Sequence, residues 1–119
     1  MLTNFRFFAA LCLFLGLQAL AFRITSPARD AQWKTGNRET VSWEDGPSGK
    51  LIFQLQVVNK AQFIYYDIFS GDFGAGNGQF AYKPTTKDAQ TAEWAGTYLR
   101  VIDGSGKELA VSERFDIKL

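Results

Sequence analysis

The sequence contains no histidine. Histidine is the commonest general base and the usual nitrogen ligand of zinc and copper, so its absence excludes Ser-His and Cys-His nucleophilic pairs. It also excludes copper-dependent oxidation of polysaccharides, which needs two histidine-type ligands on the metal. We therefore expect no catalytic residues, no metal site and no cofactor, and we predict that the chain is not an enzyme.

Cysteine and unbalanced charge are equally scarce. The only cysteine is Cys12, and the formal net charge of the 119 residues is +1 with no dense basic run. A nucleic-acid-binding protein shows a basic stripe or patch, so we expect no nucleic-acid partner. Without Cys12 no disulfide can form, and the fold must depend on its hydrophobic core alone.

The long apolar run of the chain occupies residues 7–17 and follows Arg6. It ends before an Ala19-Leu20-Ala21 sequence, which is typical of a signal-peptide cleavage site. The alternative is a membrane anchor, but the run is shorter than the roughly 20 residues that a spanning helix needs. We predict a cleaved signal peptide over residues 1–21, a secreted domain over residues 22–119, and no membrane association after cleavage.

The secreted part reads as a series of short strands separated by turn residues. The clearest alternation is in residues 50–59, where Leu51, Phe53, Leu55 and Val57 share one face. Further extended segments are expected at residues 22–25, 40–43, 61–70, 79–83, 99–103 and 108–119, and no window outside the leader has a helical period. About seven strands in one domain predict an all-β, Ig-like or fibronectin-III-like β-sandwich, with a small barrel as the alternative.

The core of this sandwich is expected to contain Trp43, Phe53, Leu55 and Tyr98. Tyr98 precedes a strand at the position of the tyrosine corner of Ig-like folds, where the hydroxyl bonds to the chain just upstream. We expect Trp33 and Trp43 to be buried, because a tryptophan on a strand face is more often part of the core. The alternative is that one of these rings is exposed and stacks on a sugar.

Residues 61–70 are apolar on both faces, which one sandwich layer does not require. We assign Ile64, Tyr66 and Ile68 to the core and the opposite face to ligand binding. The predicted binding residues are Phe63, Tyr65, Phe69 and Phe73, together with Trp94 from the polar segment before Tyr98. The alternative is burial of these rings beneath the glycine-rich segment 71–78.

Two catalytic interpretations are weaker. The glycines of residues 71–78 lack the spacing of a phosphate-binding loop, and no helix is expected to follow them. A glycosidase needs two carboxylates across one cleft, and Asp67, Asp72 and Glu93 are the acidic residues near aromatics. Charged side chains in solvated loops account for them more simply.

The opening motifs carry a resemblance. The sequence resembles the N-terminal Ig-like domain of the fungal cell-wall-synthesis family of the Kre/Knh type. The motifs that carry the resemblance are Ile24-Thr25-Ser26-Pro27, Trp33-Lys34-Thr35-Gly36 and Val41-Ser42-Trp43. Weaker support comes from Ala95-Gly96-Thr97-Tyr98 and Phe115-Asp116-Ile117. The same domain occurs in Ser/Thr-rich GPI-anchored fungal surface proteins. The resemblance covers nearly all of residues 22–119.

The resemblance implies a secreted, non-catalytic protein of the fungal-type cell wall or extracellular space that takes part in β-glucan assembly. Its expected partner is cell-wall β-glucan or a surface protein. The Ser/Thr-rich stalk and anchor signal of larger members are not found in this sequence, which favours an alternative: a diffusible module that binds carbohydrate or a host protein.

Overall fold

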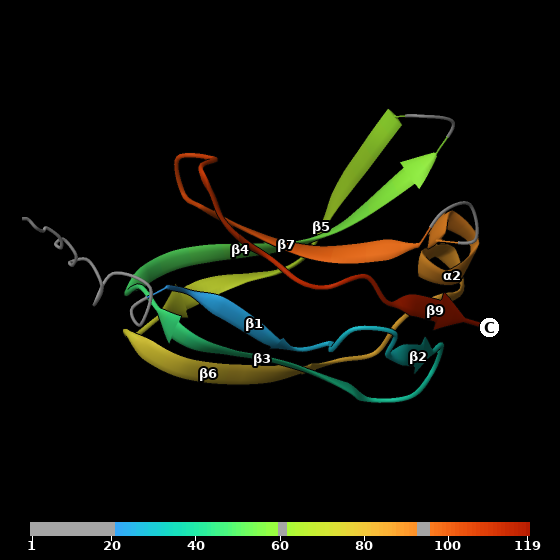
Figure 1. Ribbon diagram of the computed structural model, residues 1–119, viewed down its shortest axis with the longest axis horizontal. Helices are drawn as coiled ribbons and strands as arrows, with labels where there is room; N and C mark the ends of the chain where they lie inside the picture. Colours follow the sequence, from blue (N-terminus) through green and yellow to red (C-terminus); the bar gives the residue numbers. More distant parts are fainter. Residues whose placement is uncertain (1–20, 60–61, 93–95) are drawn as a thin grey trace, which may run out of the picture.

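The computed structural model describes residues 21–59, 62–92 and 96–119. The expected signal peptide falls almost entirely outside these residues, as does Trp94. In the described residues the chain forms nine strands and one short helix (Figure 1): β1 (Arg23–Ser26), β2 (Gln32–Lys34), β3 (Glu39–Gly46), β4 (Gly49–Asn59), β5 (Gln62–Phe73), β6 (Gly76–Tyr82), α2 (Thr86–Ala92), β7 (Thr97–Asp103), β8 (Glu108–Val111) and β9 (Asp116–Lys118).

The strands form two antiparallel layers. One sheet has the order β1-β3-β6, the other has the order β5-β4-β7-β8, and a small parallel pair joins β2 to β9. The predicted all-β sandwich is confirmed. The strand number exceeds the expected seven because β2 and β9, three residues each, pair only with one another among the described elements.

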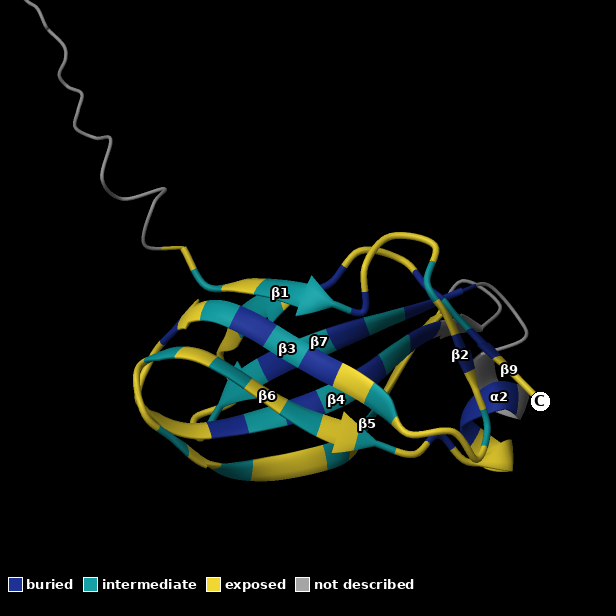
Figure 2. Cartoon of the chain, turned by 90° about the horizontal axis from the view of Figure 1, so that it is seen from below, coloured by how far each residue is buried: buried dark blue, intermediate teal, exposed yellow. Residues whose placement is uncertain are grey.

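Alternation in the sequence predicts which face of each strand is inside. Leu51, Phe53, Leu55 and Val57 of β4 are all buried, as expected, and they meet Val41 and Trp43 from the opposite sheet. Figure 2 views the three-stranded sheet and shows buried residues alternating with less buried ones along β3. Trp33 is also buried, with its ring centroid 4.7 Å from that of Phe115, so both tryptophans serve the core and neither is free to stack on a sugar.

Trp43 is the centre of an aromatic cluster. Its ring centroid lies 5.0 Å from that of Phe53 and 5.1 Å from that of Phe73. The ring also covers Gly78, its cross-strand neighbour on β6, so closely that a Cβ at Gly78 would lie 2.3 Å from the ring. Glycine is therefore required at this position for space, since the tryptophan occupies the volume that a side chain would fill.

The glycine-rich segment is a crossover between the two sheets. Gly71 belongs to β5, whereas Gly76 and Gly78 belong to β6 in the other sheet. The segment therefore carries the chain from the four-stranded sheet to the three-stranded sheet. Residues 86–92, where the sequence predicts no strand and no long helix, form the short helix α2, which lies at one end of the sandwich near β9 (Figure 1).

Tyr98 does not belong to the core, which corrects its assignment. Leu99 and Val101 of β7 are buried, so the alternate residues Tyr98 and Arg100 lie on the outer face, where Tyr98 is half-buried. The tyrosine-corner bond would be made to the chain just upstream, and residues 93–95 lie outside the described residues.

Candidate functional site

A β-bulge divides the predicted aromatic face of β5. Phe53 of β4 pairs with Phe69, but the next residue, Gln54, pairs with Asp67, so Ile68 is the extra residue. A bulge shifts the alternation of side chains by one position. Phe63, Tyr65 and Asp67 therefore lie on the outer face of the sheet, whereas Phe69 and Phe73 lie on the face that carries Phe53.

The prediction that Phe69 and Phe73 belong to one binding patch with Phe63 and Tyr65 is consequently wrong. Phe69 stacks on Phe80 of β6 with ring centroids 4.4 Å apart, and Phe73 packs edge-on against Trp43. Phe69 keeps 40% of its surface exposed because it lies at the open margin between the two sheets. Both rings are extensions of the core.

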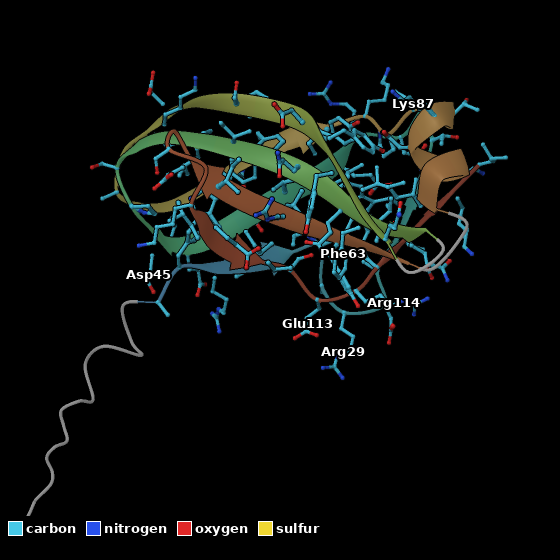
Figure 3. The ribbon with its side chains drawn as sticks, turned by 90° about the horizontal axis from the view of Figure 1, so that it is seen from above. Arg29, Asp45, Phe63, Lys87, Glu113 and Arg114 are labelled. Carbon is cyan, nitrogen blue, oxygen red and sulfur yellow. The ribbon has the colours of Figure 1, made fainter. Side chains whose placement is uncertain are left out.

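On the outer face of the four-stranded sheet, Phe63 and Tyr65 are exposed (Figure 3, where Phe63 is labelled), beside the half-buried Tyr98. Phe63 is 59% exposed and Tyr65 42% exposed, and the two ring planes are inclined by 29° with centroids 6.2 Å apart. On the same face, the guanidinium carbon of Arg100 lies 4.4 Å from the Tyr65 ring centroid. Such a cation–π contact orients the tyrosine ring beside Phe63.

Beside the rings, a row of polar side chains crosses all four strands of the sheet. Arg100 on β7 donates from Nη1 to Gln54 Oε1 on β4 at 3.1 Å, and Gln54 Nε2 donates to Asp67 Oδ1 on β5 at 2.8 Å. The Arg100 Nε donates to Glu108 Oε1 on β8 at 2.8 Å. Bonds between side chains on neighbouring strands hold them in place, so the row is a preorganised polar border along the aromatic pair.

We call this surface the outer-face platform and define it by Phe63, Tyr65, Gln54, Asp67 and Arg100. Phe63 and Tyr65 were predicted as binding residues, and Asp67 was considered only as a catalytic candidate. Its carboxylate accepts a hydrogen bond from Gln54. Gln54 and Arg100 were missed; their alternation with Phe53 and Val101 in the sequence already places them on an outer face.

A second polar cluster is buried at the α2 end of the sandwich. The Asp88 carboxylate accepts hydrogen bonds from the hydroxyls of Tyr66 at 2.6 Å and Tyr82 at 2.5 Å, and from the Thr85 backbone N–H at 2.9 Å. The Asp88 N–H donates in return to the Thr85 hydroxyl at 3.2 Å. This reciprocal pair is a capping box at the start of α2. The Thr85-x-x-Asp88 spacing could have revealed it.

The buried cluster is a structural anchor. Tyr66 belongs to β5, Tyr82 to β6 and Asp88 to α2, so one carboxylate joins the helix to both sheets. Burial, followed by the hydrogen bond to Asp88 and its negative charge, raises the pKa of both tyrosines well above the ordinary value. Both hydroxyls are therefore kept protonated as donors.

Stability is expected to fall as the pH rises above about 10, where free tyrosine titrates. In that range the unfolded chain loses protons that Tyr66 and Tyr82 retain in the fold, so unfolding is favoured by up to about 1.4 kcal/mol per pH unit for each tyrosine. Melting temperatures measured between pH 8 and 11 test this. Tyr66→Phe with Tyr82→Phe should flatten the profile above pH 10, whereas Tyr65→Phe on the surface is the control. A profile unchanged by the double substitution would contradict the assignment.

No cluster of three or more metal-ligating side chains occurs among the described residues. Within the same part of the chain, no helix is long and apolar enough to cross a membrane.

Comparisons with known proteins assign the chain to no family. No family model matches the sequence, and no curated protein matches it. Among solved structures, the chain is similar to fibronectin(III)-like modules of CbhA from Clostridium thermocellum, with 14% identity and a TM-score of 0.40. The match covers 82% of this chain and 94% of that chain. At this identity and TM-score the similarity carries no argument about a ligand.

Proposed function

We propose that the chain is a secreted, non-catalytic binding module whose outer-face platform recognises polysaccharide. The observation that carries the proposal is the placement of Phe63 and Tyr65, two neighbouring exposed rings bordered by a fixed polar row. Aromatic faces stack on the C–H surface of sugar rings, while amide, carboxylate and guanidinium groups exchange hydrogen bonds with hydroxyls. An extended polymer fits such a surface because the sheet presents it without a closed pocket.

The absence of catalysis is part of the same proposal. The chain has no histidine, and the buried carboxylate of Asp88 already accepts three hydrogen bonds. Asp67 accepts a hydrogen bond from Gln54 at the surface. Neither carboxylate has the environment of a general acid held in a cleft.

Within polysaccharides, we propose cell-wall β-glucan as the ligand. The support is the resemblance of the opening motifs to the Kre/Knh type of fungal cell-wall protein, together with the expected signal peptide. A protein with this function is either retained in the cell wall or released into the medium. Measuring the amount of protein in the wall fraction and in the culture filtrate separates these two cases.

The experiment is a sedimentation assay with insoluble β-1,3-glucan, β-1,6-glucan and chitin. Phe63→Ala with Tyr65→Ala should weaken glucan binding about thirtyfold, because two central aromatic anchors together contribute about 2 kcal/mol or more. The melting temperature should change by only a few degrees, since both rings are exposed. Leu119→Ala, outside the four-stranded sheet and 70% exposed, is the control and should bind normally.

Three results would contradict the proposal. Full glucan binding by the double variant would place the site elsewhere, and no binding of the unaltered protein to any of the three polymers would exclude a wall polysaccharide as ligand. Loss of folding in the double variant would show that the rings belong to the core.

A further inference from the structure

β5 is the outermost strand of the four-stranded sheet and has an unpaired edge. It pairs with β4 along one side, and no described strand pairs with its other side. At 12 residues it is the longest strand of the described chain, about twice the mean length of a protein strand. An unpaired edge of this length presents a row of backbone N–H and C=O groups that can pair with another strand.

The first half of this edge lacks the devices that prevent pairing. Residues 62–66 contain no charge and no proline, whereas soluble proteins place lysine or proline on edge strands. Gln62, Phe63, Ile64 and Tyr65 are all exposed, so this segment is apolar and open on both faces of the sheet. Figure 1 shows the end of β4 and the start of β5 projecting from the sandwich.

The edge changes character beyond this segment. Asp67 is charged and the bulge at Ile68 follows it, and bulges are among the features that protect an edge. The opposite edge strand, β8, is four residues long and carries Glu108. Within the four-stranded sheet, the pairing-competent edge is therefore confined to residues 62–66.

We propose that this segment pairs with the same segment of a second copy of the chain, antiparallel and about a two-fold axis at Ile64. The segment is self-complementary: Phe63 of one copy then faces Tyr65 of the other on the outer face, and Ile64 faces its own copy on the other face. Aromatic cross-strand pairs are among the favourable ones, and a two-fold axis uses one patch on both partners.

Charge selects the antiparallel arrangement. In a parallel, in-register pair, each Asp67 would lie beside its copy at the strand spacing of about 4.8 Å, and like charges directly opposite are destabilising. With the axis at Ile64, the two Asp67 positions are six residues apart along the strand, about 20 Å. This distance exceeds the screening length of about 8 Å at physiological salt.

The pairing extends the outer-face platform. A two-fold axis perpendicular to the sheet joins the two four-stranded sheets into one of eight strands with both outer faces on the same side. The rings of Phe63 and Tyr65 from both copies then form one continuous aromatic surface. The pairing itself does not depend on the proposed function. The role of the enlarged surface in binding polysaccharide rests on the proposed function.

Sedimentation-velocity measurements on the secreted protein without glucan test the pairing. The unaltered protein should be a dimer at micromolar concentration. Ile64→Lys brings two positive charges together on the axis and should raise the dimer dissociation constant at least tenfold, whereas Val111→Lys, at a comparably exposed position on β8, should leave the dimer intact. A monomeric unaltered protein, or a dimer lost equally in both variants, would overturn the proposal.

Cysteine cross-linking gives a second readout that does not depend on the folding of Ile64→Lys. Cys12 is the only cysteine, so in a chain starting at Phe22 any disulfide comes from an introduced residue. Single substitutions to cysteine at Gln62, Ile64 and the exposed Ser70 should give the most covalent dimer at Ile64, because only residues near the axis bring their Cβ atoms within bonding range. Uniform cross-linking at all three would contradict the register. The glucan sedimentation assay with Ile64→Lys then separates the polysaccharide-binding proposal from the dimer proposal. If the monomeric variant still binds glucan, the outer-face platform binds polysaccharide without the dimer.

Discussion

Trp43→Ala is expected to lower the free energy of unfolding by about 3–5 kcal/mol, the usual effect of removing a fully buried aromatic side chain. The Trp43 ring packs against Phe53 and Phe73, so its removal leaves a cavity where the two sheets meet. Domains of this size have about 5–15 kcal/mol of stability in total, and no disulfide supplements it. The melting temperature should fall by more than about 10 °C, and less protein should be secreted.

The control for Trp43→Ala is Trp43→Phe, which keeps a ring in the same place and should cost less. A second comparison is Gly78→Ala, which leaves the ring in place but adds a Cβ where the ring lies. Overpacking of this kind typically costs about 1–3 kcal/mol. A Trp43→Ala protein that melts at the temperature of the unaltered chain would show that the ring does not stabilise the sandwich.

Asp88→Ala is expected to have the second largest effect, about 3 kcal/mol or more. The substitution deprives Tyr66, Tyr82 and Thr85 of an acceptor, and each buried donor left unsatisfied costs about 1–3 kcal/mol. It also removes half of the capping box of α2. Chemical denaturation at pH 7 measures the loss.

Asp88→Asn separates the two contributions of this carboxylate. The amide oxygen can still accept a hydrogen bond, so it should retain part of the stability that Asp88→Ala loses. In the background Tyr66→Phe with Tyr82→Phe, Asp88→Ala should cost less, because two of the donors no longer need an acceptor. Equal losses in both backgrounds would show that the tyrosine hydroxyls contribute nothing through Asp88.

The sequence predicts the sandwich and its inner strand because regular alternation is a local property. Leu51, Phe53, Leu55 and Val57 repeat every second residue, which a strand with one buried face requires. The same rule applied to β7 would have placed Tyr98 outside, since Leu99 and Val101 are its apolar set. The assignment of Tyr98 to the core followed an analogy of position and overrode the alternation.

The division of β5 could not be predicted in this way. Its alternation is interrupted at Ile68 by a bulge that exists only in the pairing with β4, and apolar residues occupy both odd and even positions of the strand. A sequence that satisfies either face does not specify where the register changes. The platform therefore retains Phe63 and Tyr65 from the predicted set and gains Gln54 and Arg100, which only the register brings beside them.

The parallel pairing of β2 with β9 has a consequence for biosynthesis. Trp33 on β2 lies opposite Ile117 on β9, and both are part of the core. A contact between an early strand and the last strand forms only after all the intervening chain has been made, and such distant contacts slow folding. During synthesis, the earlier strands therefore keep part of their apolar surface uncovered, and a chain that ends before residue 116 lacks the β9 partner of Trp33.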